Sequence, residues 1–259
     1  MVSRGYDVAE FLDRDAEILR LREQANVFAE DEERALGAVG MPPEGVALDV
    51  GCGPGFVAER IRRARPRLSV TGCDVDTAMV ELARVRIHAH CADAIALPFD
   101  DATYDVAYAR LVLRHLSNPL LAINEMRRVV RPGGRVVILD GDDETMVLHP
   151  RPVLFYAAVA ARHAGMRARG ADPLFGRKLV GLLSAAGLTE LRIAPIYVHS
   201  GQSGPKTFTR ILSAWLDAID PSFMCLADVA AARNEIEAWA RSPGAFGMMG
   251  LVVVSGSRA

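Results

Sequence analysis

Three aspartates and a short glycine-rich run have the residue types needed to bind a nucleoside. Gly51, Gly53 and Gly55 alternate with other residues directly after Asp49, and further acids stand at Asp74 and Asp93. Glycine lets the backbone turn sharply and approach a ligand closely. A carboxylate at a strand end can accept hydrogen bonds from ribose hydroxyls. Three acids without clustered Lys or Arg indicate a nucleoside with a cationic centre, and argue against a polyphosphate.

The elements around these residues are expected to alternate between strands and helices. Asp76 is suited to cap a helix over 77–86, and Asn118 with Pro119 to open one that ends near residue 130. The expected strands are 46–50, 68–74, 88–91, 104–109, 135–140, 189–198 and 246–256. Such alternation predicts βαβ units and a mostly parallel sheet. Asp49, Asp74 and Asp93 then lie together at the carboxyl edge, where open α/β sheets bind ligands.

The glycine run alone fits several nucleotide cofactors. A nicotinamide-dinucleotide loop follows the pattern G-x-G-x-x-G/A, and the position of its third small residue is held here by Phe56. A bulky side chain there disfavours an NAD-dependent oxidoreductase. The plain alternative is a tight strand-to-helix connection without a ligand.

Taken together, these motifs resemble the class I S-adenosylmethionine-dependent methyltransferases, in particular the branch that includes the ubiquinone/menaquinone-biosynthesis enzymes. The resemblance covers roughly residues 41–141. The segments that carry it, in the family's order, are 48–55 (LDVGCGPG), 72–76 (GCDVD), 91–94 (CADA) with 97–99 (LPF), 104–107 (YDVA) through 112–116 (VLRHL), and 125–134 (EMRRVVRPGG). One such segment is weak evidence, but the ordered set is specific.

The resemblance implies a Rossmann-like class I methyltransferase fold of the α/β class, with seven mostly parallel strands and the last one antiparallel. It also implies S-adenosyl-L-methionine as cofactor. Asp74 would hold the ribose hydroxyls, and the glycine loop would approach the methionine part. Arg110 would line the sulfonium or face the substrate. The implied cofactor-binding residues are Asp49, Gly51, Gly53, Gly55, Asp74, Val75, Met79, Asp93, Ala94 and Arg110.

Methyl transfer needs alignment of the acceptor and exclusion of water, and some acceptors must also lose a proton. The candidates for a catalytic base are His115, Asp142 and His149. His115 follows the fourth strand, although relatives with different substrates share it, which favours a structural role. Asp142 follows the fifth strand on the ligand edge, and loop capping is its alternative. His149 precedes Pro150 and also fits an ordinary loop. Asp143, His199 and Tyr6 are further candidates.

The rest of the chain is expected to supply a cover. We expect a helical cap at 1–40, a cofactor-binding core at 41–143, and the remaining core at 144–259 with helical insertions at 144–172 and 200–243. A lid built from 1–30 and the two insertions would exclude water during transfer.

Composition restricts the class of protein. The net charge is −2 among 259 residues, which does not suggest a nucleic-acid-binding surface. The four cysteines show no metal-binding or redox spacing, so we expect no metal and a reducing compartment. The chain shows no signal-peptide pattern and no transmembrane segment. These features predict a cytoplasmic monomer or homodimer whose partner is a small-molecule methyl acceptor.

The leading hypothesis is therefore a methyltransferase acting on O, N or C of a small, partly apolar metabolite in natural-product biosynthesis. The main alternative is a protein of the same fold that binds S-adenosylmethionine for regulation or for a reaction other than methylation. A methyltransferase of macromolecules is disfavoured by the lack of a basic face.

Overall fold

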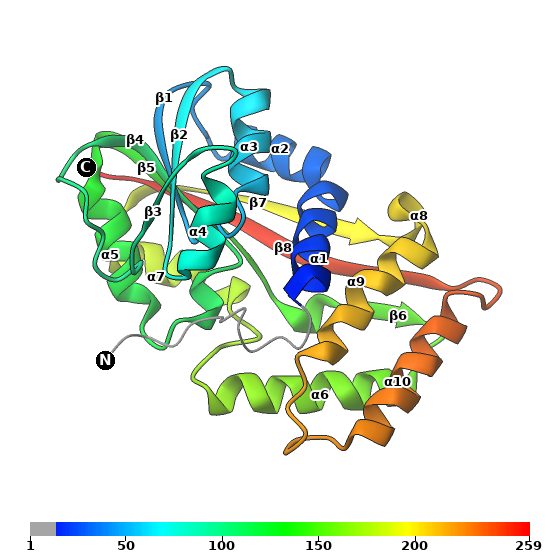
Figure 1. Ribbon diagram of the computed structural model, residues 1–259. Helices are drawn as coiled ribbons and strands as arrows, with labels where there is room; N and C mark the ends of the chain where they lie inside the picture. Colours follow the sequence, from blue (N-terminus) through cyan, green and yellow to red (C-terminus); the bar gives the residue numbers. More distant parts are fainter. Residues whose placement is uncertain (1–13) are drawn as a thin grey trace.

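The computed structural model describes residues 14–259, and its centre is one mixed sheet with helices on both faces (Figure 1). The strand order is β3-β2-β1-β4-β5-β8-β6, and β7 pairs with the other edge of β8. Strands β1 to β5 pair in parallel, whereas β8 runs antiparallel to β5, β6 and β7. The expected mostly parallel sheet with an antiparallel last strand is confirmed.

The element bounds agree closely with the sequence pattern in the first half of the chain. The strands are β1 (Glu44–Val50), β2 (Arg67–Asp74), β3 (His88–Cys91), β4 (Tyr104–Arg110), β5 (Val130–Gly141), β6 (Val147–His149), β7 (Thr189–His199) and β8 (Phe246–Ser257). The sheet has one strand more than expected, because β6 is too short to show a periodic pattern. β5 also begins earlier than predicted, since the Arg131–Gly134 stretch extends β5 instead of forming a separate turn.

Some of the helices begin at the residues that the sequence marks as helix starts. They are α1 (Arg14–Val27), α2 (Ala29–Ala38), α3 (Phe56–Ala64), α4 (Thr77–Ala83), α5 (Pro119–Val129), α6 (Val153–Ala168), α7 (Leu179–Ala185), α8 (Ser200–Ser203), α9 (Pro205–Asp217) and α10 (Leu226–Trp239). Asp76 caps α4 as predicted, accepting hydrogen bonds from the N–H groups of Ala78 and Met79. Pro119 is the first residue of α5, but the Asn118 side chain makes no capping bond.

Alternation along the strands gives each face of the sheet its own core. In β4, Val106 and Tyr108 pack with the cluster under α2, α3 and α4, whereas Ala107 and Ala109 pack with the cluster under α5 and α7. Side chains of successive strand residues point to opposite faces, so a buried strand must be apolar on both. This two-sided core fixes the carboxyl edge of β1 to β5.

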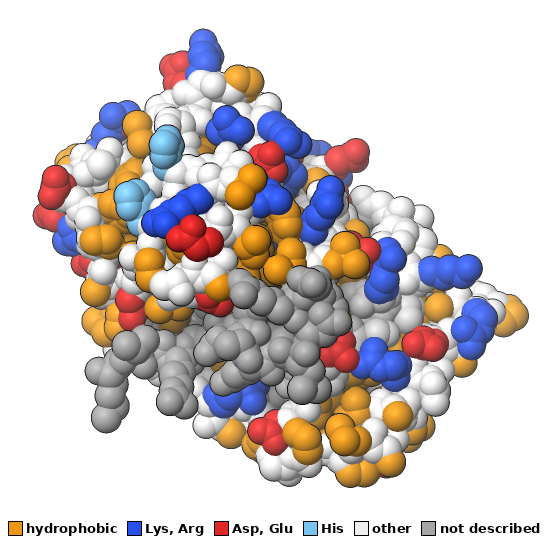
Figure 2. Space-filling model, viewed as in Figure 1, with side chains coloured by type: hydrophobic (Ala, Val, Ile, Leu, Met, Phe, Trp, Pro, Cys, Tyr) orange, Lys and Arg blue, Asp and Glu red, His pale blue; other side chains and the backbone are white. Residues whose placement is uncertain are grey.

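Helices α6, α9 and α10 pack on one another beyond that edge, and α1 lies beside α9 (Figure 1). They fall in the segments expected to be helical insertions. Over α6 and α10, hydrophobic side chains reach the surface (Figure 2), including Val153 and Leu226. Charged side chains of both signs are distributed over the same view of the surface. Within residues 14–259, no helix has the length and apolar character needed to cross a membrane.

Candidate functional site

The glycine turn after β1 is bound to the end of β2 by one carboxylate. The Gly53 N–H donates to Asp74 Oδ2 (2.8 Å), and the Asp76 N–H donates to Asp74 Oδ1 (3.0 Å). A carboxylate can accept about four hydrogen bonds, so each oxygen keeps acceptor capacity for a ligand. No atom lies within 4 Å of the place where a Cβ on Gly53 would stand, which leaves its backbone open to close approach.

Asp49 is the second acid of the site and is only 3% exposed. Burial raises the pKa of Asp49 to about 7, and the negative charges of Glu32 and Asp74 add to that rise, while Arg110 and Arg60 oppose it. A carboxylate held near neutrality is poised to ionise when a cation binds beside it. The geometry therefore suits a ligand with a positive centre.

The remaining cofactor-binding candidates lie on the same edge, after β2 and β3. Asp93 accepts a hydrogen bond on Oδ1 from the Ile95 N–H (3.2 Å), and its Oδ2 has no hydrogen-bond partner within residues 14–259. Val75 is 41% exposed, and Met79 is buried at the start of α4. An apolar pair beside a free carboxylate oxygen suits a flat base with an exocyclic amino group.

These residues line one cavity of about 260 Å³. Of the predicted cofactor residues, the cavity wall contains Asp49, Gly51, Gly53, Asp74, Val75, Met79, Asp93, Ala94 and Arg110. Of the predicted catalytic residues, it contains His115 and Asp142. The structure therefore brings together residues from the carboxyl ends of β1 to β5, while the roles assigned to them stay predictions.

Gly55 and His149 are not part of the cavity wall within residues 14–259. Gly55 begins α3 with a left-handed backbone (φ 80°), and a Cβ there would lie 3.2 Å from Ala83 of α4. Close helix packing therefore explains why this position is a glycine, and the predicted cofactor contact of Gly55 stays a prediction. His149 ends β6, is exposed, and pairs with Phe246 of β8. His149 is thus the last residue of a strand and not part of the expected loop, and its role as a base stays a prediction.

A buried ion cluster under the cavity was not predicted. Glu32 of α2 is fully buried and accepts hydrogen bonds from Tyr108 Oη (2.7 Å) and Arg110 Nε (3.0 Å). Arg60 Nη2 lies 2.8 Å from the same carboxylate. Burial would raise the pKa of Glu32, but Arg110, Arg60 and the Tyr108 hydrogen bond hold it below its ordinary value. Arg110 also donates to the Gln24 carbonyl (3.3 Å), so it joins β4 to α1 and α2.

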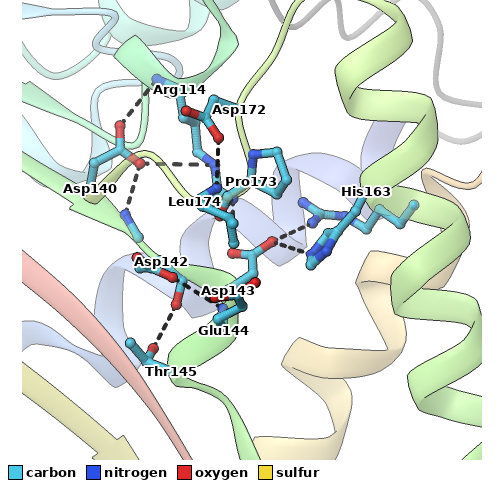
Figure 3. Close-up of polar contacts among 12 residues, drawn as sticks. Arg114, Asp140, Asp142, Asp143, Glu144, Thr145, His163, Asp172, Pro173 and Leu174 are labelled. Carbon is cyan, nitrogen blue, oxygen red and sulfur yellow. Dashed lines mark hydrogen bonds and ion pairs between the residues drawn. The ribbon is translucent and has the colours of Figure 1, made fainter. Parts of the chain in front are cut away.

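A second cluster lies at the ends of β4 and β5 (Figure 3). Arg114 Nη2 donates to Asp143 Oδ1 (2.8 Å) and to the Pro173 carbonyl (3.0 Å). Asp143 Oδ2 lies 2.8 Å from Arg162 Nη1 and 3.1 Å from His163 Nε2. Burial would raise the pKa of Asp143, yet Arg114, the His163 hydrogen bond and Arg162 hold it far below its usual range. Asp143 is thus a poor proton acceptor.

Asp140 lies deeper in the same cluster. It is fully buried and accepts from the backbone N–H groups of Arg114 (3.2 Å) and Gly141 (2.8 Å) (Figure 3). Burial raises the pKa of Asp140 to about 6, although Arg114 and the two backbone bonds oppose the rise. Asp140 does not line the cavity, which assigns it to holding the Arg114 segment.

The catalytic candidates at this end have constrained surroundings. Asp142 accepts from the Glu144 N–H (3.2 Å) and is paired with Arg177 through both carboxylate oxygens. Burial and the positive charges of Arg114 and Arg162 lower the pKa of His115 to about 3. A neutral imidazole can accept a hydrogen bond, but such a low pKa makes it a weak base. The capping alternative for Asp142 therefore fits its contacts.

Several residues of the cavity wall come from helices outside the recognisable motifs. They are Arg20, Gln24 and Phe28 near the N-terminus, Arg162 of α6, and Ile211 and Trp215 of α9. Arg20, Gln24 and Phe28 lie in the expected N-terminal helical cap, and the only sequence signal of the other three was the amphipathic character of the insertions. Tyr6, a further candidate, lies outside the described residues.

Comparison with known proteins identifies the central segment. Residues 48–138 match a family model described as a methyltransferase domain. A ubiquinone/menaquinone biosynthesis C-methyltransferase from Desulfotalea psychrophila is 31% identical over 148 residues, 54% of this chain and 60% of that protein. The chain spans about half the length of the curated relatives it matches.

Solved structures support the same fold. A structure described as a methyltransferase from an antibiotic biosynthesis pathway of Anabaena variabilis superposes with a TM-score of 0.64 at 14% identity, covering 86% of this chain and 96% of that one. The [4+2]-cyclase SpnF superposes with a TM-score of 0.56 at 23% identity, covering 88% and 81%. The predicted Rossmann-like class I methyltransferase fold is confirmed.

Proposed function

We propose that the chain, whose residues 48–138 match a methyltransferase domain, transfers a methyl group from S-adenosylmethionine to a small metabolite. The acceptor atom is O, N or C, the acceptor is partly apolar, and the setting is natural-product biosynthesis. S-adenosyl-L-methionine, the predicted cofactor, agrees with the domain family.

One observation carries this proposal. The acids at the ends of β1, β2 and β3 and the open glycine turn line the same cavity as apolar side chains from α1 and α9. The acids form one part of the wall, which we call the acidic end: Asp49, Asp74 and Asp93. A nucleoside at the acidic end leaves the rest of the cavity for a second molecule. Group transfer requires that the donor and the acceptor bind side by side in one cavity.

The side chains present fit the cofactor. S-adenosylmethionine, when bound, supplies a methyl group already activated by a sulfonium. Asp74 has acceptor capacity for two hydroxyls, and the Asp93 Oδ2 atom has capacity for an amino group. Asp49 offers a negative charge that a cation would favour. The covering helices α1, α6 and α9 exclude water from the cavity.

Binding calorimetry tests the cofactor. We expect the wild-type chain to bind both S-adenosylmethionine and S-adenosylhomocysteine, and Asp74→Ala to weaken both by ~1–3 kcal/mol, the cost of a lost hydrogen bond to a charged group. Asp100→Ala is the matched control, because Asp100 is an exposed aspartate outside the cavity wall. Absence of binding by the wild type would sink the proposal.

Transfer itself needs a second experiment. Incubation with radiolabelled cofactor and a metabolite extract should label a small molecule, and Asp74→Ala should reduce the label at cofactor concentrations below saturation. Binding without any labelled product would favour the alternative of a cofactor-binding protein with another activity. Label confined to RNA or protein would identify a macromolecular acceptor instead.

A further inference from the structure

The part of the cavity away from the acidic end is lined by three arginines, Arg20, Arg114 and Arg162, together with Asp142 and Asp143. We call it the arginine end and define it by Arg20, Arg114, His115, Arg162 and Trp215, which all line the cavity. Along the sheet it lies at β4 and β5, whereas the acidic end lies at β1 to β3. The two groups thus occupy successive stretches of one carboxyl edge.

Arg162 is the side chain at this end with donors to spare. Its Nη1 donates to Asp143 Oδ2 (2.8 Å), and its guanidinium carbon lies 4.8 Å from the centre of the Trp215 ring. Nε and Nη2 donate to no residue within 14–259. The side chain is 12% exposed, so it is held between α6 and α9 while facing the cavity. A guanidinium presents a planar fork suited to a carboxylate or a similar anion.

The nearby acids do not accept hydrogen bonds from the remaining donors of Arg162. Asp143 is shared among Arg114, Arg162 and His163, and Asp142 is paired with Arg177, which lies outside the cavity wall. The local potential is positive enough that Arg114 and Arg162 both lower the pKa of the His115 imidazole, in addition to burial. A negatively charged acceptor would therefore be stabilised at this position.

The lining residues of this end also offer no strong base. Asp142 is paired with Arg177, and Asp143 is paired with Arg114 and Arg162, so neither carboxylate readily accepts a proton. Burial and the nearby arginines disfavour protonation of His115. An acceptor that is already ionised near neutral pH needs none. Stacked beside Trp215, such an acceptor is best a flat, conjugated one, because aromatic faces favour planar partners.

Building on the proposed methyl transfer, we propose that the acceptor is a delocalised organic anion, an aromatic or unsaturated carboxylate or acidic enol, held by Arg162. One atom of the anion pairs with Arg162, and a conjugated atom attacks the methyl carbon. The new bond takes its electron pair from the anion, and the carbon–sulfur bond breaks with its pair going to sulfur. The negative and positive charges cancel, so no proton has to leave.

Fragment binding tests this inference on the full chain saturated with S-adenosylhomocysteine. The probes are benzoate and its neutral analogue benzamide, titrated by ligand-detected NMR. We expect the wild type to bind benzoate at least ~10-fold more tightly than benzamide, the effect of hydrogen bonds to charged partners. Arg162→Met should remove that preference, and Arg162→Lys should retain part of it.

Arg233→Met is the matched control, because Arg233 pairs with Asp217 and neither residue lines the cavity; its benzoate preference should equal that of the wild type. Binding of S-adenosylhomocysteine reports that each variant is folded. Equal binding of the two fragments by the wild type, no detectable benzoate binding, or an unchanged preference in Arg162→Met would each overturn the inference. Failure of the wild type to bind S-adenosylhomocysteine would instead overturn the proposed function.

Discussion

The acidic end and the arginine end of the cavity differ in origin as well as in charge. The acidic end is built from the turns after β1, β2 and β3, inside the segment that matches the methyltransferase domain. Two of the residues that define the arginine end, Arg162 and Trp215, come from α6 and α9, which lie outside that segment. The residues proposed to bind the cofactor thus come from the sheet edge that the methyltransferase domain has in common with its relatives. The residues proposed to bind the acceptor come in part from helices added to that domain.

The electrostatics of the two ends are opposite. At Asp49 burial raises the carboxyl pKa, and the charges of Glu32 and Asp74 add to the rise. At His115 burial lowers the imidazole pKa, and the charges of Arg114 and Arg162 add to the fall. The first environment favours a bound cation and the second a bound anion. Opposite potentials in one cavity would bring a cationic donor and an anionic acceptor together, which lowers the cost of aligning them.

The largest expected effect comes from the cluster between the two ends. Glu32→Leu removes the buried carboxylate that pairs with Arg110 and Arg60, whose side chains are 9% and 18% exposed, and leaves both guanidinium charges without it. We expect the free energy of unfolding to fall by ~3–5 kcal/mol, since an uncompensated buried charge is costly. Urea denaturation measures the loss, and Glu32→Gln should lose less because it keeps hydrogen bonding.

Glu44→Gln is the control for that experiment. Glu44 pairs with Arg67 at 3.3 Å, and both side chains are mostly exposed. Exposed pairs contribute less than about 1 kcal/mol. If Glu32→Leu were no more destabilising than Glu44→Gln, the ion pairs of Glu32 with Arg110 and Arg60 would not be what joins the N-terminal helices to the sheet.

Asp49 gives the next largest effect and sharpens the charge comparison. Its folded pKa, about 7, lies above the ordinary value, so the folded state binds the proton more tightly than the unfolded state does. Wild-type stability should therefore fall as pH rises from about 4 to about 7. Asp49→Asn should lack this fall and be more stable than wild type at pH 8, by on the order of 2–4 kcal/mol.

The same group should make cofactor binding depend on pH. A sulfonium favours the ionised carboxylate, so affinity for S-adenosylmethionine should rise by roughly 10-fold between pH 6 and pH 8 relative to S-adenosylhomocysteine. The comparison of the two ligands, by calorimetry, isolates the sulfonium charge. A pH-independent ratio in the wild type, or the same rise in Asp49→Asn, would assign the charge recognition to another group.

The sequence predicted the acidic end because its signals are local. Asp49 and Gly51 sit within one strand-to-helix turn, and parallel pairing of β1 with β2 brings Asp74 alongside without further information. At the arginine end, Arg114 and His115 lie in the recognised segment 112–116, but Arg162 and Trp215 have no such signal. Arg162 and Trp215 meet only because α6 packs against α9, and such long-range packing has no counterpart in a local pattern.

Gly55 and His149 are the two predicted site residues that are not part of the cavity wall within residues 14–259, and in both cases the sequence pattern could not show this. Gly55 matched a motif position, but the motif does not distinguish a glycine needed for ligand approach from one needed for helix packing against Ala83. His149 was chosen by residue type alone, and β6, which carries it away from the cavity, is too short to be recognised. The place of a site residue could be predicted where the pairing of parallel strands fixes its position. It could not be predicted where the position depends on helix packing or on a short strand.

Substitutions of two glycines separate the shape of the turn from its contact with ligand. Gly51 has φ 73°, and a Cβ there would lie 2.4 Å from Val112, so Gly51→Ala should lose ~2 kcal/mol of stability as well as cofactor affinity. Gly53 has φ 52° with open space around its Cβ position. Gly53→Ala should lose only about 1 kcal/mol of stability, yet still weaken cofactor binding.

Thermal unfolding and calorimetry on both variants give the comparison. Equal stability losses would mean that Val112 yields to the added methyl group. Unchanged cofactor affinity in Gly53→Ala would mean that the ligand does not approach this part of the turn. The cofactor would then contact other residues of the acidic end.

Trp215→Leu gives the smallest expected effect and bears only on the arginine end. The ring lies over Arg162 at 4.8 Å, and a cation–π contact of this kind contributes about 0.5–2 kcal/mol. We expect benzoate affinity to fall ~3–10-fold and affinity for S-adenosylhomocysteine to change less than ~2-fold, since 1.4 kcal/mol corresponds to tenfold. Phe223→Leu, at a half-exposed aromatic residue outside the cavity wall, should change neither. A parallel loss of both affinities in Trp215→Leu would mean that the two ends do not bind their ligands separately, because α9 would then be shaping the whole cavity.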